Sequence, residues 1–180
     1  MSTKSVNFDG MSTMTTNQDL DPVALRQAFG AFPTGVVALA AEVDGIQVGL
    51  AASSFTSVSL DPPLVSVSVA HTSKTWPDLR RARHFGVTVL ADHHGTVCRQ
   101  LSGPVESRFE GVEVSVSDDG AVTLDEGLVR FDCSLYREVE AGDHVIVLLQ
   151  VHAVEHGAEE DAGKPLVFHR SVFGRLERSA

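Results

Sequence analysis

The stretch GLAASSFTSVSLDPPL, residues Gly49–Leu64, starts like a β-strand and ends in a rigid Asp-Pro-Pro sequence. Its middle is rich in hydroxyl groups, while Phe55 and Val58 are side chains that can anchor a strand to a core. Five of the seven residues from position 53 to position 59 carry a hydroxyl: Ser53, Ser54, Thr56, Ser57 and Ser59. An ordinary core strand would not carry so many.

Two interpretations of this stretch are open. Each hydroxyl can donate a hydrogen bond to an anionic oxygen, and the small side chains let a ligand approach the backbone. The stretch would then be a cradle for a phosphate or for the polar edge of a ring. Alternatively, it is an edge strand and loop whose hydroxyls satisfy the hydrogen-bonding groups of its own backbone.

The composition is that of one folded domain. The chain has 180 residues, of which 43% are hydrophobic, and this is enough for a sizeable core. We expect the polar residues 1–18 to form a disordered tail and residues 19–180 to form the domain. The net charge of −10 argues against nucleic acid and against an anionic membrane as main partners. It does not exclude an anionic ligand, because a local site in an acidic protein can still be basic.

The sequence contains little that indicates a disulfide framework, secretion, a membrane span or a metal site. Cys98 and Cys133 form neither a CxxC pair nor a disulfide framework, so we expect free thiols in a cytoplasmic protein. The polar start of the chain lacks the apolar segment of a secretory signal, and no run is long enough for a transmembrane helix. His152 and His156 could share one face of a strand, but no third ligand is spaced with them, so no metal site is expected.

The hydrophobic pattern is mainly that of β-strands. Asp21-Pro22 predicts the start of a helix, because aspartate caps helices and proline fits the first turn, and Gly30 can end it. Asp44-Gly45 is a hairpin signal. We expect short helices near 76–83 and 92–101, and strands over 36–42, 46–55, 64–69, 85–90, 112–117, 128–138, 145–156, 165–168 and 173–176. Many strands, short turns and few helices predict an antiparallel barrel, closed or partly closed.

Two further segments could contribute to a site. In Ser73-Lys74-Thr75 a lysine stands between two hydroxyls just before a possible helix, so charge and free amides could combine to bind an anion. In Gly142-Asp143-His144, glycine permits a tight turn and His144 begins the next strand at the rim of the barrel. An exposed lysine beside a helix cap and an exposed turn histidine are the simpler alternatives.

Taken together, these segments resemble the flavin reductase-like family, whose members are FMN-binding split β-barrels. The run AASSFTSVSLDPPLVSVSV carries the main resemblance. Shorter matches in the same order extend it from about Ala24 to the end of the chain: FPTGV at 32–36, TSKTW at 72–76, Arg108-Phe109, GDH at 142–144 and PLVF at 165–168.

The resemblance implies a mainly β split barrel that acts as an NAD(P)H:flavin oxidoreductase, with hydride passing from the nicotinamide C4 to the flavin N5. FMN or FAD would be the flavin, and NADH or NADPH the donor. It also implies a homodimer that supplies a flavin-dependent monooxygenase by diffusion of reduced flavin. We expect His144 to be catalytic and to donate a hydrogen bond to the nicotinamide. The cofactor-binding residues implied are Thr34, Gly35, Ser53, Ser54, Ser59, Ser73, Lys74, Thr75, Arg108 and Phe168.

Two alternatives to a reductase remain at this point. One is a split-barrel flavin carrier or sensor without reductase activity, and the other is a structural β-barrel dimer module. Phe168 and Phe173 stand where relatives often carry tyrosine, which puts the nicotinamide contacts of that segment in question.

Overall fold

The computed structural model describes residues 20–157 and 163–176. The tail expected for residues 1–18 lies outside this part of the chain. The helices are α1 (Pro22–Phe29), α2 (Trp76–Leu79) and α3 (Gly95–Leu101), with short 3-10 turns at Asp92–His94 and Val105–Ser107. The strands are β1 (Thr34–Gly35), β2 (Val37–Val43), β3 (Ile46–Ala52), β4 (Thr56–Leu60), β5 (Pro63–Ala70), β6 (Phe85–Val89), β7 (Val114–Val116), β8 (Val122–Leu124), β9 (Val129–Ala141), β10 (His144–His156), β11 (Leu166–His169) and β12 (Val172–Arg175).

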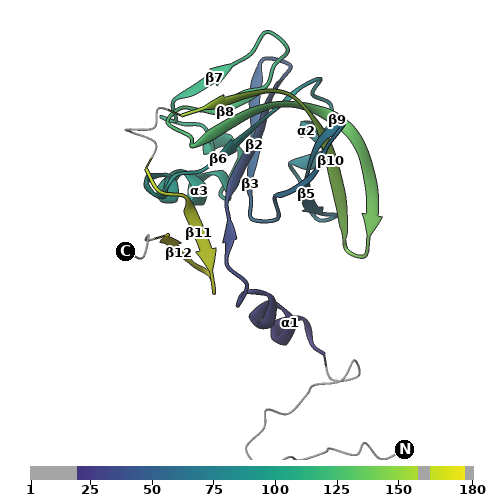
Figure 1. Ribbon diagram of the computed structural model, residues 1–180, viewed down its shortest axis with the longest axis vertical. Coiled ribbons are helices and arrows are strands. Elements are labelled where there is room, and N and C mark those ends of the chain that lie inside the picture. The colour runs from purple at the N-terminus through teal and green to yellow at the C-terminus, as the bar shows by residue number, and fades with distance from the viewer. Residues whose placement is uncertain (1–19, 158–162, 177–180) are drawn as a thin grey trace, which may run out of the picture.

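Seven strands form the main sheet, in the order β3-β2-β6-β9-β10-β5-β4, and they curve around a common core (Figure 1). Every strand pair in the described ranges is antiparallel, as the sequence predicted. The two edge strands, β3 and β4, follow one another in the sequence, so residues 53–55 carry the chain from one edge of the sheet to the other. The barrel is therefore split, and the serine-rich stretch crosses the split.

Ser54 attaches the crossing segment, residues 53–55, to strand β5. β4 pairs with β5 only as far as Thr56 opposite Ser66, which leaves the outward backbone groups of Ser68 without a strand partner on that side. The hydroxyl of Ser54 accepts a hydrogen bond from the Ser68 N–H at 2.9 Å and donates one to the Ser68 carbonyl at 3.1 Å. One side chain thus continues the ladder where the strand stops.

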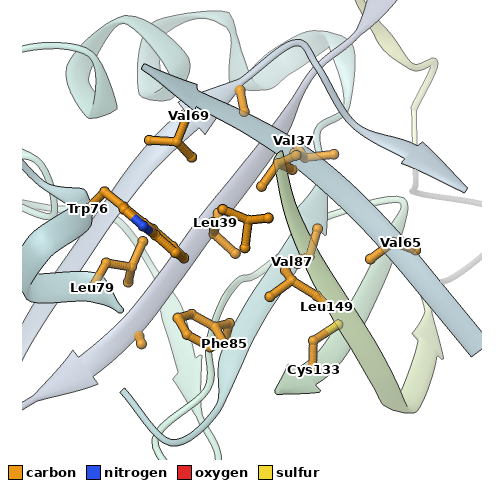
Figure 2. Packing of buried hydrophobic residues seen from close by; sticks show 14 of the residues in the cluster. Val37, Leu39, Val65, Val69, Trp76, Leu79, Phe85, Val87, Cys133 and Leu149 are labelled. Atoms are coloured by element: carbon orange, nitrogen blue, oxygen red, sulfur yellow. The ribbon is translucent and has the colours of Figure 1, made fainter. Parts of the chain in front are cut away.

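The core inside the barrel is built by alternating residues of several strands (Figure 2). On β2, Val37, Leu39 and Ala41 face this core, whereas Ala38, together with Val36 just before the strand, belongs to a second cluster that includes residues of α3. A strand buried on both faces should have a nearly continuous apolar sequence, and VALAAEV has it. Burying such side chains stabilises the fold by about 1.5–3 kcal/mol each.

Helix α2 closes one end of the barrel. Trp76 and Leu79 are buried in the core, and the Trp76 ring stacks on Phe85 with 6.1 Å between centroids. The indole N–H donates to Glu138 Oε1 at 2.8 Å, while Arg80 Nη2 contacts Glu138 Oε2 at 2.6 Å. Because α2 is held so tightly, the loop that precedes it has a fixed position.

One expectation about the N-terminal half needs correction. The strand predicted over 46–55 ends at Ala52, because the chain must leave the sheet there to cross the split. The helix begins at Asp21 and ends at Gly30 as predicted, with Asp21 Oδ1 accepting from two backbone amides. Its apolar side chains, however, are not buried by the described part of this chain, and Phe29 is 71% exposed.

Replacing Ser54 with alanine should destabilise the protein, because the N–H and carbonyl of Ser68 would lose their partner in a partly buried place. We expect the free energy of unfolding to fall by about 1–3 kcal/mol in a denaturant titration. The matched control is Ser57→Ala, at an exposed position of β4, which should change it by no more than about 0.5 kcal/mol. Equal effects of the two substitutions would contradict the role of Ser54.

Candidate functional site

A pocket of about 710 Å³ lies where the chain crosses the split. Its walls come from four places: the end of β3 with the crossing, the end of β5 with the loop before α2, the segment after α3, and the start of β10. The lining residues are Leu50–Ser54, Ser68–Ala70, Thr72–Thr75, Leu101–Val105, Arg108 and His144. This volume is within the range of pockets that hold cofactors and other small ligands.

Most hydroxyls of the pocket hold the walls together. Ser54 bonds to the backbone of Ser68, as described above. Ser73 Oγ accepts the Trp76 N–H at 3.2 Å and so caps the first turn of α2. Thr75 is buried, and its hydroxyl accepts from Arg108. Ser53 and Thr72 are exposed and have no side-chain hydrogen bond within the described ranges, so their hydroxyls are available to a ligand.

Arg108 forms hydrogen bonds to three segments around the pocket. Its Nη1 donates to the Gly49 carbonyl at 2.8 Å and to Thr75 Oγ1 at 2.7 Å, and its Nε donates to the Gly103 carbonyl at 3.0 Å. Burial lowers the pKa of the Arg108 guanidinium, which nevertheless stays charged because arginine is not deprotonated in proteins. These three bonds leave Nη2 for a ligand in the pocket.

The charge of the pocket is opposite to that of the chain. Lys74, Arg108 and His144 are the ionisable side chains among its lining residues as described, and none of the lining residues is acidic. The chain as a whole carries −10. Two fixed positive charges in such a protein fit an anionic ligand, such as the phosphate of a nucleotide. The polar lining and the volume of the pocket therefore fit a flavin nucleotide.

His144 stands at the rim of the pocket, at the start of β10. Gly142 adopts a left-handed conformation with a φ of 67°, which permits the turn between β9 and β10. His144 Nδ1 lies 2.6 Å from Asp143 Oδ1, and this hydrogen bond is the main reason that the pKa of Asp143 lies below its ordinary value. The Asp143 carbonyl accepts the His71 N–H, which ties the turn to the end of β5.

The structure brings seven of the predicted site residues together in this pocket: Ser53, Ser54, Ser73, Lys74, Thr75, Arg108 and His144. Phe168 lies in a smaller pocket of about 130 Å³ that shares Ala51, Ala52, Ser53 and Ser102 with the first. The other three do not line either pocket. Thr34 and Gly35 form β1, which pairs with β11, and Ser59 is paired in the edge strand β4.

Two segments that line the pocket were not predicted from the sequence as parts of a site. No site residue was predicted in Leu101–Val105, which begins at the end of the helix expected near 92–101, although Ser102-Gly103-Pro104 is a strong turn signal. Ser68 was predicted as a strand residue and Ala70 follows the predicted strand 64–69, and nothing in their sequence indicates that β4 stops short of them. Only the pairing of the strands exposes the end of β5 to the pocket.

Neither cysteine is suited to nucleophilic chemistry. Burial and the charge of Asp132 raise the pKa of the Cys133 thiol to about 12. Burial also raises the pKa of Cys98, which lines the smaller pocket. A thiol with a raised pKa carries little of the reactive thiolate at neutral pH.

Comparisons with known proteins show the family of this chain. A family model described as a flavin reductase like domain matches residues 29–177. The chain belongs to the flavin reductase-like family. Among similar members, a flavin reductase of Pseudomonas putida is 38% identical over 156 residues, which cover 86% of this chain and 90% of the relative. The reductase subunit HsaB of a flavin-dependent monooxygenase of Rhodococcus jostii is 33% identical, covering 88% of this chain and 80% of the relative.

Solved structures of the family have the same fold. The NADH:FAD oxidoreductase SgcE6 of Streptomyces globisporus superimposes with a TM-score of 0.84 at 29% identity, covering 94% of this chain and 100% of that one. A second structure of SgcE6 is described as a complex with NAD and FAD fragments, with a TM-score of 0.81 at 30% identity, covering 89% of this chain and 95% of that one. The family, the split-barrel fold and the flavin reductase activity predicted from the sequence are confirmed.

Lys74→Glu should weaken flavin binding, because it replaces an attractive charge at the pocket with a repulsive one. We expect a loss of about 1–3 kcal/mol of binding free energy in a fluorescence titration with FMN. The control is Arg83→Glu, which changes the charge equally at an exposed residue that does not line the pocket. Unchanged FMN affinity in a folded Lys74→Glu variant would remove Lys74 from the site.

Proposed function

We propose that this chain binds FMN or FAD in the pocket at the split and reduces it with NADH or NADPH bound beside it. The observation that carries this proposal is a basic pocket in an acidic chain, lined by uncharged polar and small apolar groups apart from Lys74, Arg108 and His144. Such a lining suits a ligand that combines a phosphate with a flat ring.

The position of each lining residue indicates which part of the ligand it would contact. Lys74 and the free Nη2 of Arg108 would hold the phosphate, and the exposed hydroxyl of Ser53 would bond to the flavin. Ala51 and Ala52 leave room for a ring to lie against the crossing. The bound flavin supplies the chemistry by accepting a hydride from the nicotinamide. The protein supplies proximity, since both rings must stack in one pocket.

His144 marks the end of the pocket at which the nicotinamide would enter. It lies on the rim and is partly exposed, so a second ligand can reach it without displacing the first. Its ring is held by Asp143, and the β9–β10 turn is held by His71, so its position is fixed before any ligand binds. Hydride transfer requires no proton from it, and His144 serves to orient the nicotinamide.

The likeness to reductase subunits supports a flavin-dependent monooxygenase as the partner that receives reduced flavin by diffusion. A homodimer is supported by helix α1, which projects from the barrel with Val23, Phe29 and Phe32 more than half exposed (Figure 1). A second copy would cover these side chains, and sedimentation velocity distinguishes that dimer from a monomer.

The two free cysteines support a cytoplasmic location. Within the described residues, no helix could cross a membrane.

One anaerobic experiment separates this function from its alternatives. Purified protein mixed with FMN or FAD and then with NADH or NADPH should bleach the flavin absorption band. Bleaching should be catalytic, so that excess free flavin is also reduced. A carrier would bind flavin without bleaching it, and a structural module would bind none, so either result would overturn the proposal.

A further inference from the structure

The histidine at the rim of the pocket has only one nitrogen free. His144 Nδ1 faces the Asp143 carboxylate at 2.6 Å, whereas Nε2 has no hydrogen-bond partner among the described residues. An ionised carboxylate can only accept hydrogen bonds, so the proton of the ring must lie on Nδ1. In the neutral ring Nε2 is then an acceptor, because the two ring nitrogens share a single proton.

The surroundings keep the Asp143 carboxylate ionised and leave it able to accept a hydrogen bond from His144. Its side chain is 94% exposed, and its hydrogen bond to His144 holds its pKa below the ordinary value. The nearest other acid on the hairpin, Glu140, pairs instead with His71 at 3.2 Å. Lys74, in the same pocket, carries a positive charge and so cannot replace Asp143 as the acceptor for the ring.

We infer that Asp143 is a positioning residue, which fixes the proton of His144 on Nδ1 and so presents Nε2 as an acceptor to the carboxamide N–H of the nicotinamide. This inference rests on the proposed function for the identity of the ligand. It reverses the bond expected from the sequence, in which His144 donates. Donation by Nε2 holds only for the doubly protonated ring.

The proton position can be measured without any ligand. In ¹⁵N-labelled protein at alkaline pH, the His144 ring should show the Nδ1–H tautomer by NMR. Asp143→Ala should shift it to the Nε2–H tautomer that free histidine prefers. Asp143→Glu should retain the Nδ1–H tautomer, because a carboxylate at this position can still only accept. The control Glu140→Ala removes the same charge from the same hairpin and should change nothing. An Nε2–H tautomer in the unmodified protein would overturn the inference.

The direction of the bond can be measured with a dinucleotide that lacks the carboxamide N–H. FMN-loaded protein should bind NAD⁺ roughly tenfold more tightly than its 3-acetylpyridine analogue, which keeps the carbonyl but cannot donate. This preference should disappear in Asp143→Ala and in His144→Ala, and persist in Asp143→Glu and Glu140→Ala. Since the preference is a ratio within each variant, a general loss of affinity does not imitate it.

Equal binding of the two dinucleotides by the unmodified protein would contradict the acceptor role of His144. If neither dinucleotide bound to the FMN-loaded protein, the proposed function would fail. The tautomer measured without ligand would still decide whether Asp143 positions the ring.

Discussion

The hydrogen bonds between the Ser54 hydroxyl and the backbone of Ser68 are the constraint on which the pocket depends. They join the segment that follows edge strand β3 to β5, beyond the point where β4 stops pairing with β5. Without them, the crossing segment would lie beside the end of β5 with both backbone groups of Ser68 unpaired. The same bonds set the distance between two walls of the pocket, since both segments line it.

The pocket combines rigidity with a few free groups. Ser73 is occupied with the cap of α2, and Thr75 with Arg108, so the loop that carries Lys74 is fixed on both sides of the lysine. Arg108 in turn ties that loop to β3 and to the segment after α3. Among the described residues, the groups left for a ligand include Lys74, one nitrogen of Arg108, the hydroxyls of Ser53 and Thr72, and His144 Nε2. A pocket whose walls are fixed before binding loses little entropy when the ligand enters.

The sequence predicted much of this, for reasons that can be traced to particular residues. The antiparallel fold followed from strand periodicity and from turn signals such as Asp44-Gly45 and Gly142, which depend only on neighbouring residues. The serine-rich stretch posed two readings, a ligand cradle or hydroxyls that satisfy backbone groups. Ser54 bonds to the backbone of Ser68, outside this stretch, while Ser53 is exposed, so the cradle stays a prediction. Which serine does which depends on the pairing of β3, β4 and β5, and that is a property of the whole sheet.

The remaining differences also come from long-range contacts. The sequence marked Arg108 as a ligand contact, but not that three of its bonds hold the pocket together. The described part of the chain leaves the apolar side chains of α1 unburied, and the local signals that predicted this helix carry no information about that. Thr34, Gly35 and Ser59 were grouped with the site because of their motifs, and the strand order places them outside the pocket that the other residues share.

The central claim is that the flavin binds where the chain crosses the split. Hydrogen–deuterium exchange of the protein with and without FMN tests it most directly, because bound ligand slows exchange of the amides that it covers. The account predicts slower exchange in residues 50–54, 68–75 and 101–108 and at the start of β10. Protection confined to another hollow of the surface, such as the one lined by His93, Glu113 and Glu126, would contradict it.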